Sequence, residues 1–325
     1  MIVAGIDEAG YGPLLGPLVV SVSVFRLPGE GPTDLWEALA PAVSRSTRTR
    51  AVPVDDSKKL FRQGKGLAHL EEGILPFLRL RRQDLPRDFR SFLQAVARRG
   101  SADAEAYLDI YPWYRGRNLP IPRGTFPGVV RRLSERLGER LEAAAVEFLG
   151  MASAPVEVRE FNEQIDAFEN KSRVSFAVVG RFLRRLWRQF PGESTEVIVD
   201  HQGSRTHYAP LLFETLKPRG IQIEEQTREL SRYRLSRPDR RQAGRFRVQF
   251  ATECEEKHLP VALASMLSKY VRELHMALFN EYWLELQQGL KPTAGYVVDA
   301  RRFLGETAAL RRNLGIDERL LIRSR

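Results

Sequence analysis

The chain has one cysteine, Cys254, among its 325 residues. A single cysteine excludes an intramolecular disulfide framework and is typical of proteins in a reducing compartment. It also excludes a cysteine-rich zinc site, and the five histidines are scattered without the spacing of a zinc motif. We therefore expect a cytoplasmic protein whose fold does not depend on disulfides or structural zinc.

Long hydrophobic runs are absent as well. No apolar segment reaches the length that spans a membrane. The chain enters an apolar strand almost at its first residue, where a signal peptide would carry a basic and then a longer apolar segment. We expect a monomer that does not associate with membranes.

Acidic residues are outnumbered by basic ones, 41 to 51, which gives a formal net charge of +10. A basic excess favours a polyanionic partner, and nucleic acid is the first candidate. The alternative is a chain that is simply rich in arginine throughout.

The most informative segment lies near the N-terminus, where an apolar strand meets a turn rich in glycine and proline. Residues 5–13 have the sequence Gly-Ile-Asp-Glu-Ala-Gly-Tyr-Gly-Pro. Buried carboxylates such as Asp7 and Glu8 are costly unless something pairs with them, and a divalent cation is the usual partner of clustered carboxylates. Taken alone, the pair is also compatible with a solvated turn that carries ordinary surface acids.

Three further segments accompany this one. The first is residues 55–60, with the sequence Asp-Asp-Ser-Lys-Lys-Leu, in which Asp56 is expected to cap a short helix. The second is the apolar strand 197–199, which ends in Asp200. The third is the segment 257–273, which contains Ala-Ser-Met-Leu-Ser-Lys-Tyr-Val-Arg-Glu and is predicted to be helical.

In this order the four segments resemble the type 2 ribonucleases H, the ribonuclease HII and HIII family. The resemblance implies an RNase H-like α/β fold, a mixed five-stranded sheet flanked by helices, and a site that holds two Mg²⁺ or Mn²⁺ ions. By position it assigns the catalytic and metal-binding roles to Asp7, Glu8, Asp200 and Glu255. It assigns the substrate-binding roles to Gly10, Tyr11 and Gly12 for the ribose, Lys58 and Lys59 for phosphate, and Tyr296 for stacking.

The chain departs from the family pattern in three places. Gly10-Tyr11-Gly12 stands where the family has Gly-Arg-Gly or Gly-Thr-Gly, which leaves substrate preference open. Glu255 stands where the family usually has Asp, and Glu253 and Glu256 are the neighbouring alternatives. The stretch before Asp200 is also longer than in a minimal family member, which implies an added element.

Alternating strand and helix patterns predict a layered α/β domain independently of the resemblance. We expect residues 1–81 and 150–325 to form the catalytic domain and residues 82–149 a helical insertion, with one long helix over 129–148. Residues 161–171 are expected to supply turns and caps, with Asn162 and Asn170 as weak substrate candidates. The Trp113-Tyr114 pair either stacks on nucleotides or packs into the core, and we favour the core.

The segment 227–247 is a second basic feature, since it holds eight arginines around Tyr233. It is either a solvated loop or an arm that follows phosphates and offers a stacking ring. We favour the arm because the segment leads directly into the strand and helix that carry Glu255.

These observations predict a metal-dependent endonuclease that hydrolyses the RNA strand of RNA–DNA hybrids. One alternative is a nucleic-acid-binding protein that kept the fold and lost activity. Another is a related nuclease that acts on a different nucleic-acid structure, which Tyr11 keeps open because its ring can fill the space left for a ribonucleotide.

Overall fold

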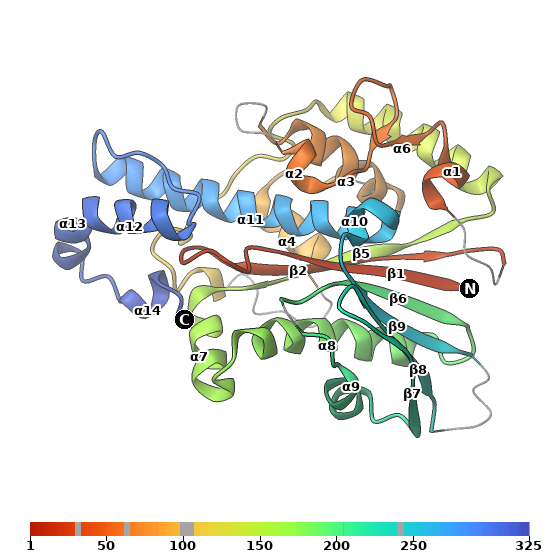
Figure 1. Cartoon of the computed structure of the whole chain (residues 1–325). Helices are drawn as coiled ribbons and strands as arrows, with labels where there is room; N and C mark the ends of the chain where they lie inside the picture. The colour runs from red at the N-terminus through yellow and green to blue at the C-terminus, as the bar shows by residue number, and fades with distance from the viewer. Residues whose placement is uncertain are drawn as a thin grey trace.

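The computed structural model describes residues 1–29, 34–61, 66–82, 84–97, 107–203, 205–238 and 244–324. Within them, the strands of the main sheet lie in the order β5-β2-β1-β6-β9-β8-β7 (Figure 1). Their bounds are β1 Ile2–Ala9, β2 Leu18–Arg26, β5 Glu147–Val156, β6 Thr195–Asp200, β7 Gly220–Gln226, β8 Leu230–Ser236 and β9 Phe246–Ala251. The pairs β1–β6 and β6–β9 are parallel and the other neighbours are antiparallel, so the sheet is mixed. A small parallel pair, β3 Val43–Ser44 and β4 Val52–Pro53, lies apart from it.

The mixed α/β class is as expected, but the expected number of five strands is wrong because the main sheet has seven. Strand β5 begins within the last residues of the helix that was predicted over 129–148, and its remaining residues were not predicted to form a strand. Strand β8 lies within the segment 227–247, for which a phosphate-binding arm was favoured over a solvated loop. The signal for β8 is an alternation along the strand, because Ser231, Tyr233 and Leu235 are buried and the residues between them are more exposed.

Helices cover both faces of the sheet, as Figure 1 shows. One face carries α11 Leu259–Leu286 together with α3 Ala68–Leu80, α6 Pro127–Ala143, α4 Phe89–Val96, α2 Ser57–Leu60 and α1 Leu35–Leu39. The other face carries α7 Val158–Phe168, α8 Lys171–Gln189 and α9 Ala209–Leu216. The remaining helices are α10 Cys254–Lys257, α12 Val297–Glu306, α13 Ala308–Asn313 and α14 Glu318–Leu321. No described helix has the length and apolar character needed to cross a membrane.

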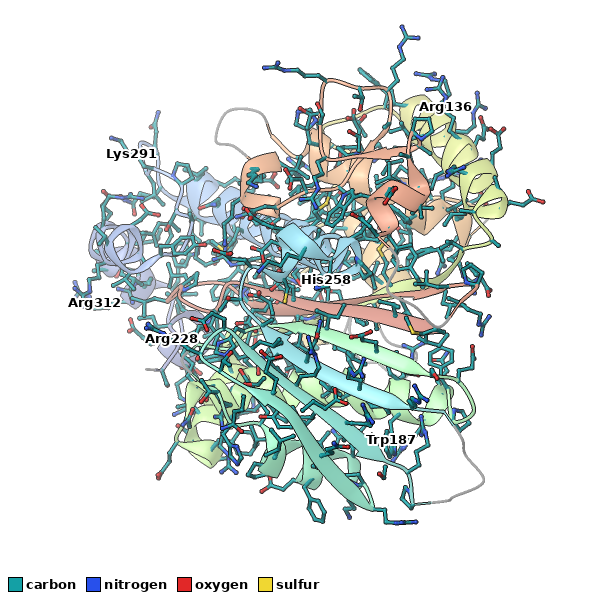
Figure 2. All side chains as sticks on the ribbon, turned by 45° about the vertical axis from the view of Figure 1, so that its right-hand side comes forward. Arg136, Trp187, Arg228, His258, Lys291 and Arg312 are labelled. Carbon is teal, nitrogen blue, oxygen red and sulfur yellow. The ribbon has the colours of Figure 1, made fainter. Side chains whose placement is uncertain are left out.

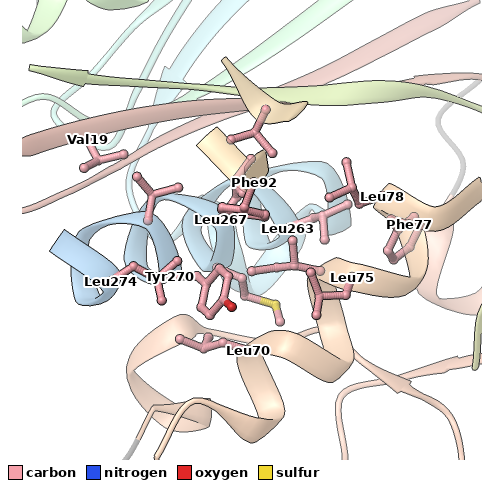
Figure 3. Packing of buried hydrophobic residues seen from close by; sticks show 14 of the residues in the cluster. Val19, Leu70, Leu75, Phe77, Leu78, Phe92, Leu263, Leu267, Tyr270 and Leu274 are labelled. Atoms are coloured by element: carbon pink, nitrogen blue, oxygen red, sulfur yellow. The ribbon is translucent and has the colours of Figure 1, made fainter. Parts of the chain in front are cut away.

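Each face of the sheet has its own apolar core. Figure 3 shows part of the core between the sheet, α3 and α11, where Leu75, Leu263 and Tyr270 lie close together. Strand β1 contributes Val3 to this core and Ile2, Ala4 and Ile6 to the core beneath α8. Because side chains alternate along a strand, the same periodicity directs Asp7 toward α11 and Glu8 toward α8.

Close contact between α11 and β1 fixes the height of this helix above the sheet. A Cβ atom at Gly5 would lie 2.2 Å from the carbonyl carbon of Pro260, so only glycine allows the approach. The hydroxyl of Ser23 on β2 donates to the Pro260 carbonyl oxygen over 2.7 Å. The helix that carries the Ala-Ser-Met motif is therefore held directly over the strand that carries Asp7.

Residues of the segment 82–149 belong to the same buried cluster as α3 and α11. Trp113 and Tyr114 are 2% and 1% exposed, which confirms the prediction that they pack into the core. The buried carboxylate of Glu71 on α3 accepts hydrogen bonds from the amides of Arg123, Gly124 and Thr125. It also accepts one from the hydroxyl of Tyr270 on α11, over 2.8 Å. One side chain thus joins α3, α11 and the loop that precedes α6.

Two helix predictions are wrong in this region. The helix expected over 129–148 ends at Ala143, and β5 begins at Glu147. Residues 161–168, predicted to form turns, belong to helix α7. The side chain of Asn162 on that helix donates to the backbone carbonyls of Arg319 and Ile322, which gives it a structural role. Asn170 caps α8 as predicted, because its side chain accepts the Ser172 amide hydrogen bond.

The arginine-rich segment is not an arm in its described part. Arg237 is 6% exposed, and its guanidinium donates to the carbonyls of Trp187 and Phe190 at the end of α8. The guanidinium lies over the ring of Trp187, which is labelled in Figure 2. Its central carbon is 4.2 Å from the ring centroid. Tyr233 is fully buried and accepts a hydrogen bond from the Tyr208 amide, so it is no stacking ring. Other arginines of the segment are ion-paired to the acids of β7, and Arg240 and Arg241 lie outside the described residues.

Candidate active site

Asp7 lies near the end of β1 on the α11 face and is 7% exposed. Burial raises the pKa of Asp7 well above its usual value, and the charge of Asp200 raises it further, with a smaller increase from Glu255. Hydrogen bonds from the Ser265 hydroxyl and the Glu8 amide oppose these effects. The carboxyl group is therefore held in a buried place beside other acids.

Serines from two of the sequence motifs hold this part of β1. Ser265 of α11, which bonds the Asp7 carboxyl group, lies 3.1 Å from the hydroxyl of Ser57. Ser268 donates to the Asp7 carbonyl oxygen over 3.0 Å and approaches the Ser21 hydroxyl. The segments 55–60 and 257–273 therefore meet at Asp7, a relationship that the linear sequence does not reveal.

Glu8 lies on the opposite face of β1, next to α8. Its carboxylate accepts hydrogen bonds from the Ser175 hydroxyl, over 2.7 Å, and from the Gln202 side-chain amide, over 3.3 Å. Gln202 also donates to the Ser175 hydroxyl, so the three side chains form a closed network. Burial raises the pKa of Glu8, and the two hydrogen bonds lower it in part. Ser175 and Gln202 carry no sequence signal of this role, since neither lies in a recognised motif.

Asp200 is the last residue of β6, the parallel neighbour of β1. Burial raises the pKa of Asp200 to about 7, and the charges of Glu255 and Glu8 contribute to the increase. Hydrogen bonds from the backbone of Cys254 and His201 oppose it. Asp200 is thus in electrostatic contact with acids on both sides of the sheet.

The neighbouring acids of α10 have different surroundings. Glu255 is the one that acts on both Asp7 and Asp200, and its side chain is 14% exposed. Glu256 is half-exposed and pairs with Lys59 over 3.0 Å. Glu253 is exposed and precedes the helix with a φ of 55°. Of these three, Glu255 alone contributes to the raised pKa of both aspartates.

The lysines of the segment 55–60 lie at the edge of this group. Asp56 caps α2 as expected, through a hydrogen bond from the Lys58 amide. The Lys58 side chain is 82% exposed, and its ammonium group lies 4.0 Å from a Glu255 oxygen. The Lys59 ammonium group lies 3.9 Å from an Asp55 carboxylate oxygen and also pairs with Glu256, so its charge is already partly compensated.

In the described part of the chain, no three His, Cys, Asp or Glu side chains form a ready-made metal-binding group. One reason is that Glu8 and Asp7 lie on opposite faces of the sheet, so their carboxyl groups point away from each other. The donor set nevertheless suits Mg²⁺ or Mn²⁺, because it consists of carboxylate oxygens. Burial and mutual repulsion raise the pKa of both aspartates, and a cation between these acids would relieve the repulsion.

The turn between β1 and β2 carries Gly10, Tyr11 and Gly12. Gly10 has a φ of 81°, a conformation that favours glycine. Gly12 is exposed, and a Cβ atom there would meet nothing within 4 Å, so its backbone is open to a ligand. The Tyr11 ring is partly buried and lies 5.2 Å from the Lys171 ammonium group, on the side of α8.

Tyr296 immediately precedes α12 and is 51% exposed. The central guanidinium carbon of Arg272 lies 5.6 Å from its ring centroid. Arg272 itself is 1% exposed and donates to the carbonyls of Leu15 and Ala294, so it supports the turn instead of facing solvent. The carbonyl of Gly295 accepts the Leu14 amide hydrogen bond, which places Tyr296 beside the Gly-Tyr-Gly turn.

No family model and no curated protein matches the chain. Among solved structures, it is similar to the PCNA:RNase HII complex from Archaeoglobus fulgidus, at 16% identity and a TM-score of 0.44, over 100% of this chain and 95% of the other. It is similar to the ribonuclease H2 from Pyrococcus horikoshii OT3, at 14% identity and a TM-score of 0.41, over 99% and 92%. It is also similar to Bst-RNase HIII in complex with Mn²⁺, at 14% identity and a TM-score of 0.42, over 99% and 66%.

Proposed function

We propose that this chain is a metal-dependent endonuclease that hydrolyses the RNA strand of RNA–DNA hybrids, the activity of a type 2 ribonuclease H. One observation carries the proposal: Asp7, which is buried, and Asp200, which is partly buried, stand at the ends of adjacent parallel strands, and the other acids around them raise the pKa of each. A protein has little structural reason to place like charges together in its interior. Such groups are typical of functional sites.

Asp7, Glu8, Asp200 and Glu255 would hold the metal ions. Two divalent cations, when bound, would supply an activated water molecule and neutralise charge on the phosphate that is attacked. The serines around Asp7 and Glu8 would keep both carboxylates oriented toward this role. The Lys58 ammonium group, exposed beside Glu255, would contact a phosphate of the substrate.

Recognition of RNA requires a group that senses the 2′-hydroxyl of a ribose. The backbone of Gly10, Tyr11 and Gly12 is proposed for this task, because it forms a turn directly after the candidate metal ligands and is open to solvent at Gly12. Tyr296, half-exposed beside the turn, would stack on the adjacent sugar or base. Lys59 would add a second phosphate contact once it exchanges Glu256 for the substrate.

The organisation of the chain is part of the proposal. Residues 1–81 and 150–325 would form the catalytic unit and residues 82–149 an insertion that packs on it, as the Glu71 contacts suggest. The buried, unpaired thiol of Cys254 fits a reducing compartment such as the cytoplasm. We further propose that the protein acts as a monomer.

The test is a cleavage assay of the purified protein with Mg²⁺ and with Mn²⁺. Its substrates are an RNA–DNA hybrid, a DNA duplex with one embedded ribonucleotide, and plain duplex DNA, and Asp200→Asn serves as the inactive control. We expect cleavage of the hybrid and none of plain DNA. Binding without cleavage by any metal would favour a nucleic-acid-binding protein, and cleavage of plain or branched DNA would favour a nuclease of another specificity.

A further inference from the structure

The turn between β1 and β2 is held by a side chain from the other end of the described chain. Arg323 is 2% exposed, and its guanidinium donates to the Gly10 carbonyl over 2.5 Å and to the Gly16 carbonyl over 2.8 Å. Its backbone amide also donates to the Leu14 carbonyl, over 3.0 Å. One residue therefore bridges both ends of the turn and its middle.

The turn needs this support because its own backbone is permissive. Gly10 and Gly16 have φ values of 81° and 77°, so each can adopt many conformations in the absence of external contacts. Gly295 accepts hydrogen bonds from the Leu14 and Leu15 amides on the other side. The amides of Tyr11 and Gly12 lie between the two carbonyls that Arg323 fixes, and their direction depends on that contact.

Burial of this guanidinium is electrostatically unfavourable. Burial lowers the pKa of Arg323 to about 9, and the positive charge of nearby Arg272 lowers it further, against the opposing effect of Glu157. Two buried guanidinium groups contact the same turn, and the loss of their hydration opposes the stability that their hydrogen bonds provide. A requirement for a fixed turn geometry accounts for the arrangement better than stability alone.

We propose that Arg323 is a positioning residue that sets the backbone of Gly10, Tyr11 and Gly12 for recognition of the ribose 2′-hydroxyl. The inference rests on the proposed function, and it adds a residue outside every motif that the sequence presents. Arg323 acts through the turn and does not touch the substrate itself.

The kinetic test compares Arg323→Ala and Arg323→Lys with Arg319→Ala. Arg319 is a matched control, since it lies four residues away and its exposed side chain pairs with Asp166. We expect kcat/KM on the hybrid to fall by roughly tenfold to a hundredfold in both Arg323 variants, and free guanidinium to restore part of it in Arg323→Ala only. Arg323→Lys keeps the charge but loses the rigid planar fork whose separate nitrogens reach the Gly10 and Gly16 carbonyls, so it tests the bridge if Arg323→Ala folds poorly.

A second measurement does not depend on catalysis. Amide hydrogen exchange of residues 10–16 should become faster in both Arg323 variants and stay unchanged in Arg319→Ala. Unchanged exchange, or faster exchange with undiminished preference for hybrid over DNA duplex in binding, would overturn the inference. A wild-type protein that cleaves no ribonucleotide-containing duplex would instead overturn the proposed function, while the exchange comparison would still decide whether Arg323 fixes the turn.

Discussion

Asp7 and Asp200 stand at equivalent positions, each one residue beyond Ile6 and Val199, the last paired residues of two adjacent parallel strands. Parallel neighbours bring the same ends of two strands to one edge of the sheet. The two carboxyl groups are therefore close because of the strand register, although 193 positions of the sequence separate them. This relationship is the basis of the first prediction.

Asp7→Asn and Asp200→Asn should each reduce hybrid cleavage by at least about a hundredfold, because each removes a charged ligand of the proposed metal site. In the presence of a chelator, the same variants should melt at a higher temperature than the wild type. The reason is that a neutral amide removes one acid from a group in which burial and repulsion raise the pKa of both aspartates. Thermal unfolding followed by circular dichroism measures the difference in melting temperature. Near-wild-type turnover in either variant would contradict the assignment.

Glu255→Gln should reduce activity far more than Glu256→Gln. Glu255 acts electrostatically on both aspartates, whereas Glu256 pairs with Lys59 at the surface. Steady-state rates at saturating Mg²⁺ and Mn²⁺ compare the two. If Glu256→Gln were the damaging change, Glu256 would be the fourth ligand.

Ser175→Ala should weaken metal binding by about tenfold to a hundredfold, because the Ser175 hydroxyl orients the Glu8 carboxylate. Calorimetric titration with Mn²⁺ measures the affinity directly, without substrate. Ser172→Ala, one turn earlier on α8, is the control, since its hydroxyl bonds Asn170 and Arg205 and not Glu8. Equal affinity in both variants would show that the network around Glu8 does not serve metal binding.

Glu157 should make the protein less stable as the pH rises. Burial raises the pKa of Glu157 to about 8, so the folded state keeps the proton after the unfolded state has lost it. The stability this provides is complete below pH 4.5 and is lost toward pH 8. The Nε2 atom of His275 lies 3.1 Å from the Glu157 carboxyl group, and burial lowers the pKa of His275 to about 4. The titration of His275 therefore makes the protein more stable as the pH rises, and this effect ends near pH 6.5.

Between pH 6.5 and 8, the change in stability therefore reflects Glu157 and not His275. There the free energy of unfolding of the wild type should fall relative to Glu157→Gln by about 2 kcal/mol. Urea unfolding of both proteins across this range gives the difference, in which the titration of Asp200 cancels. A difference that does not change with pH would mean that Glu157 is ionised in the folded protein.

Glu71→Gln should lower the free energy of unfolding by about 3 kcal/mol, because it removes a charged acceptor from three backbone amides and the Tyr270 hydroxyl. Glu142→Gln, at an exposed position of α6, should change it little. Limited proteolysis would show whether residues 82–149 loosen first. Full stability of Glu71→Gln would argue that the insertion is held by apolar packing alone.

Much of the fold was predictable because its signals are local. The apolar runs of β1, β2 and β6 predicted those strands within a few residues. Strand β5 was missed because its sequence, Glu-Phe-Leu-Gly-Met-Ala-Ser-Ala-Pro-Val, has small residues and no β-branched residue before its last. Strand β8 was missed because arginines alternate with its buried residues, and a segment so rich in arginine is also typical of an exposed basic loop.

The candidate site shows the same division. Short motifs pointed to Asp7, Glu8, Asp200 and Glu255, which the structure brings to one edge of the sheet on two faces. The supporting residues could not be found that way, because Ser175, Gln202 and Arg323 contact the site through folding alone. A lone serine or arginine carries no sequence signal of the partner it meets.

The contact between Arg323 and Gly10 also sets an order of events during synthesis. The chain is made from its N-terminus, so the acids of β1 and the turn exist long before the residue that fixes them, 313 positions later. A nascent chain would carry these carboxylates beside an unfixed turn. If the inference about Arg323 holds, discrimination of RNA from DNA is acquired only when the last part of the described chain has been made.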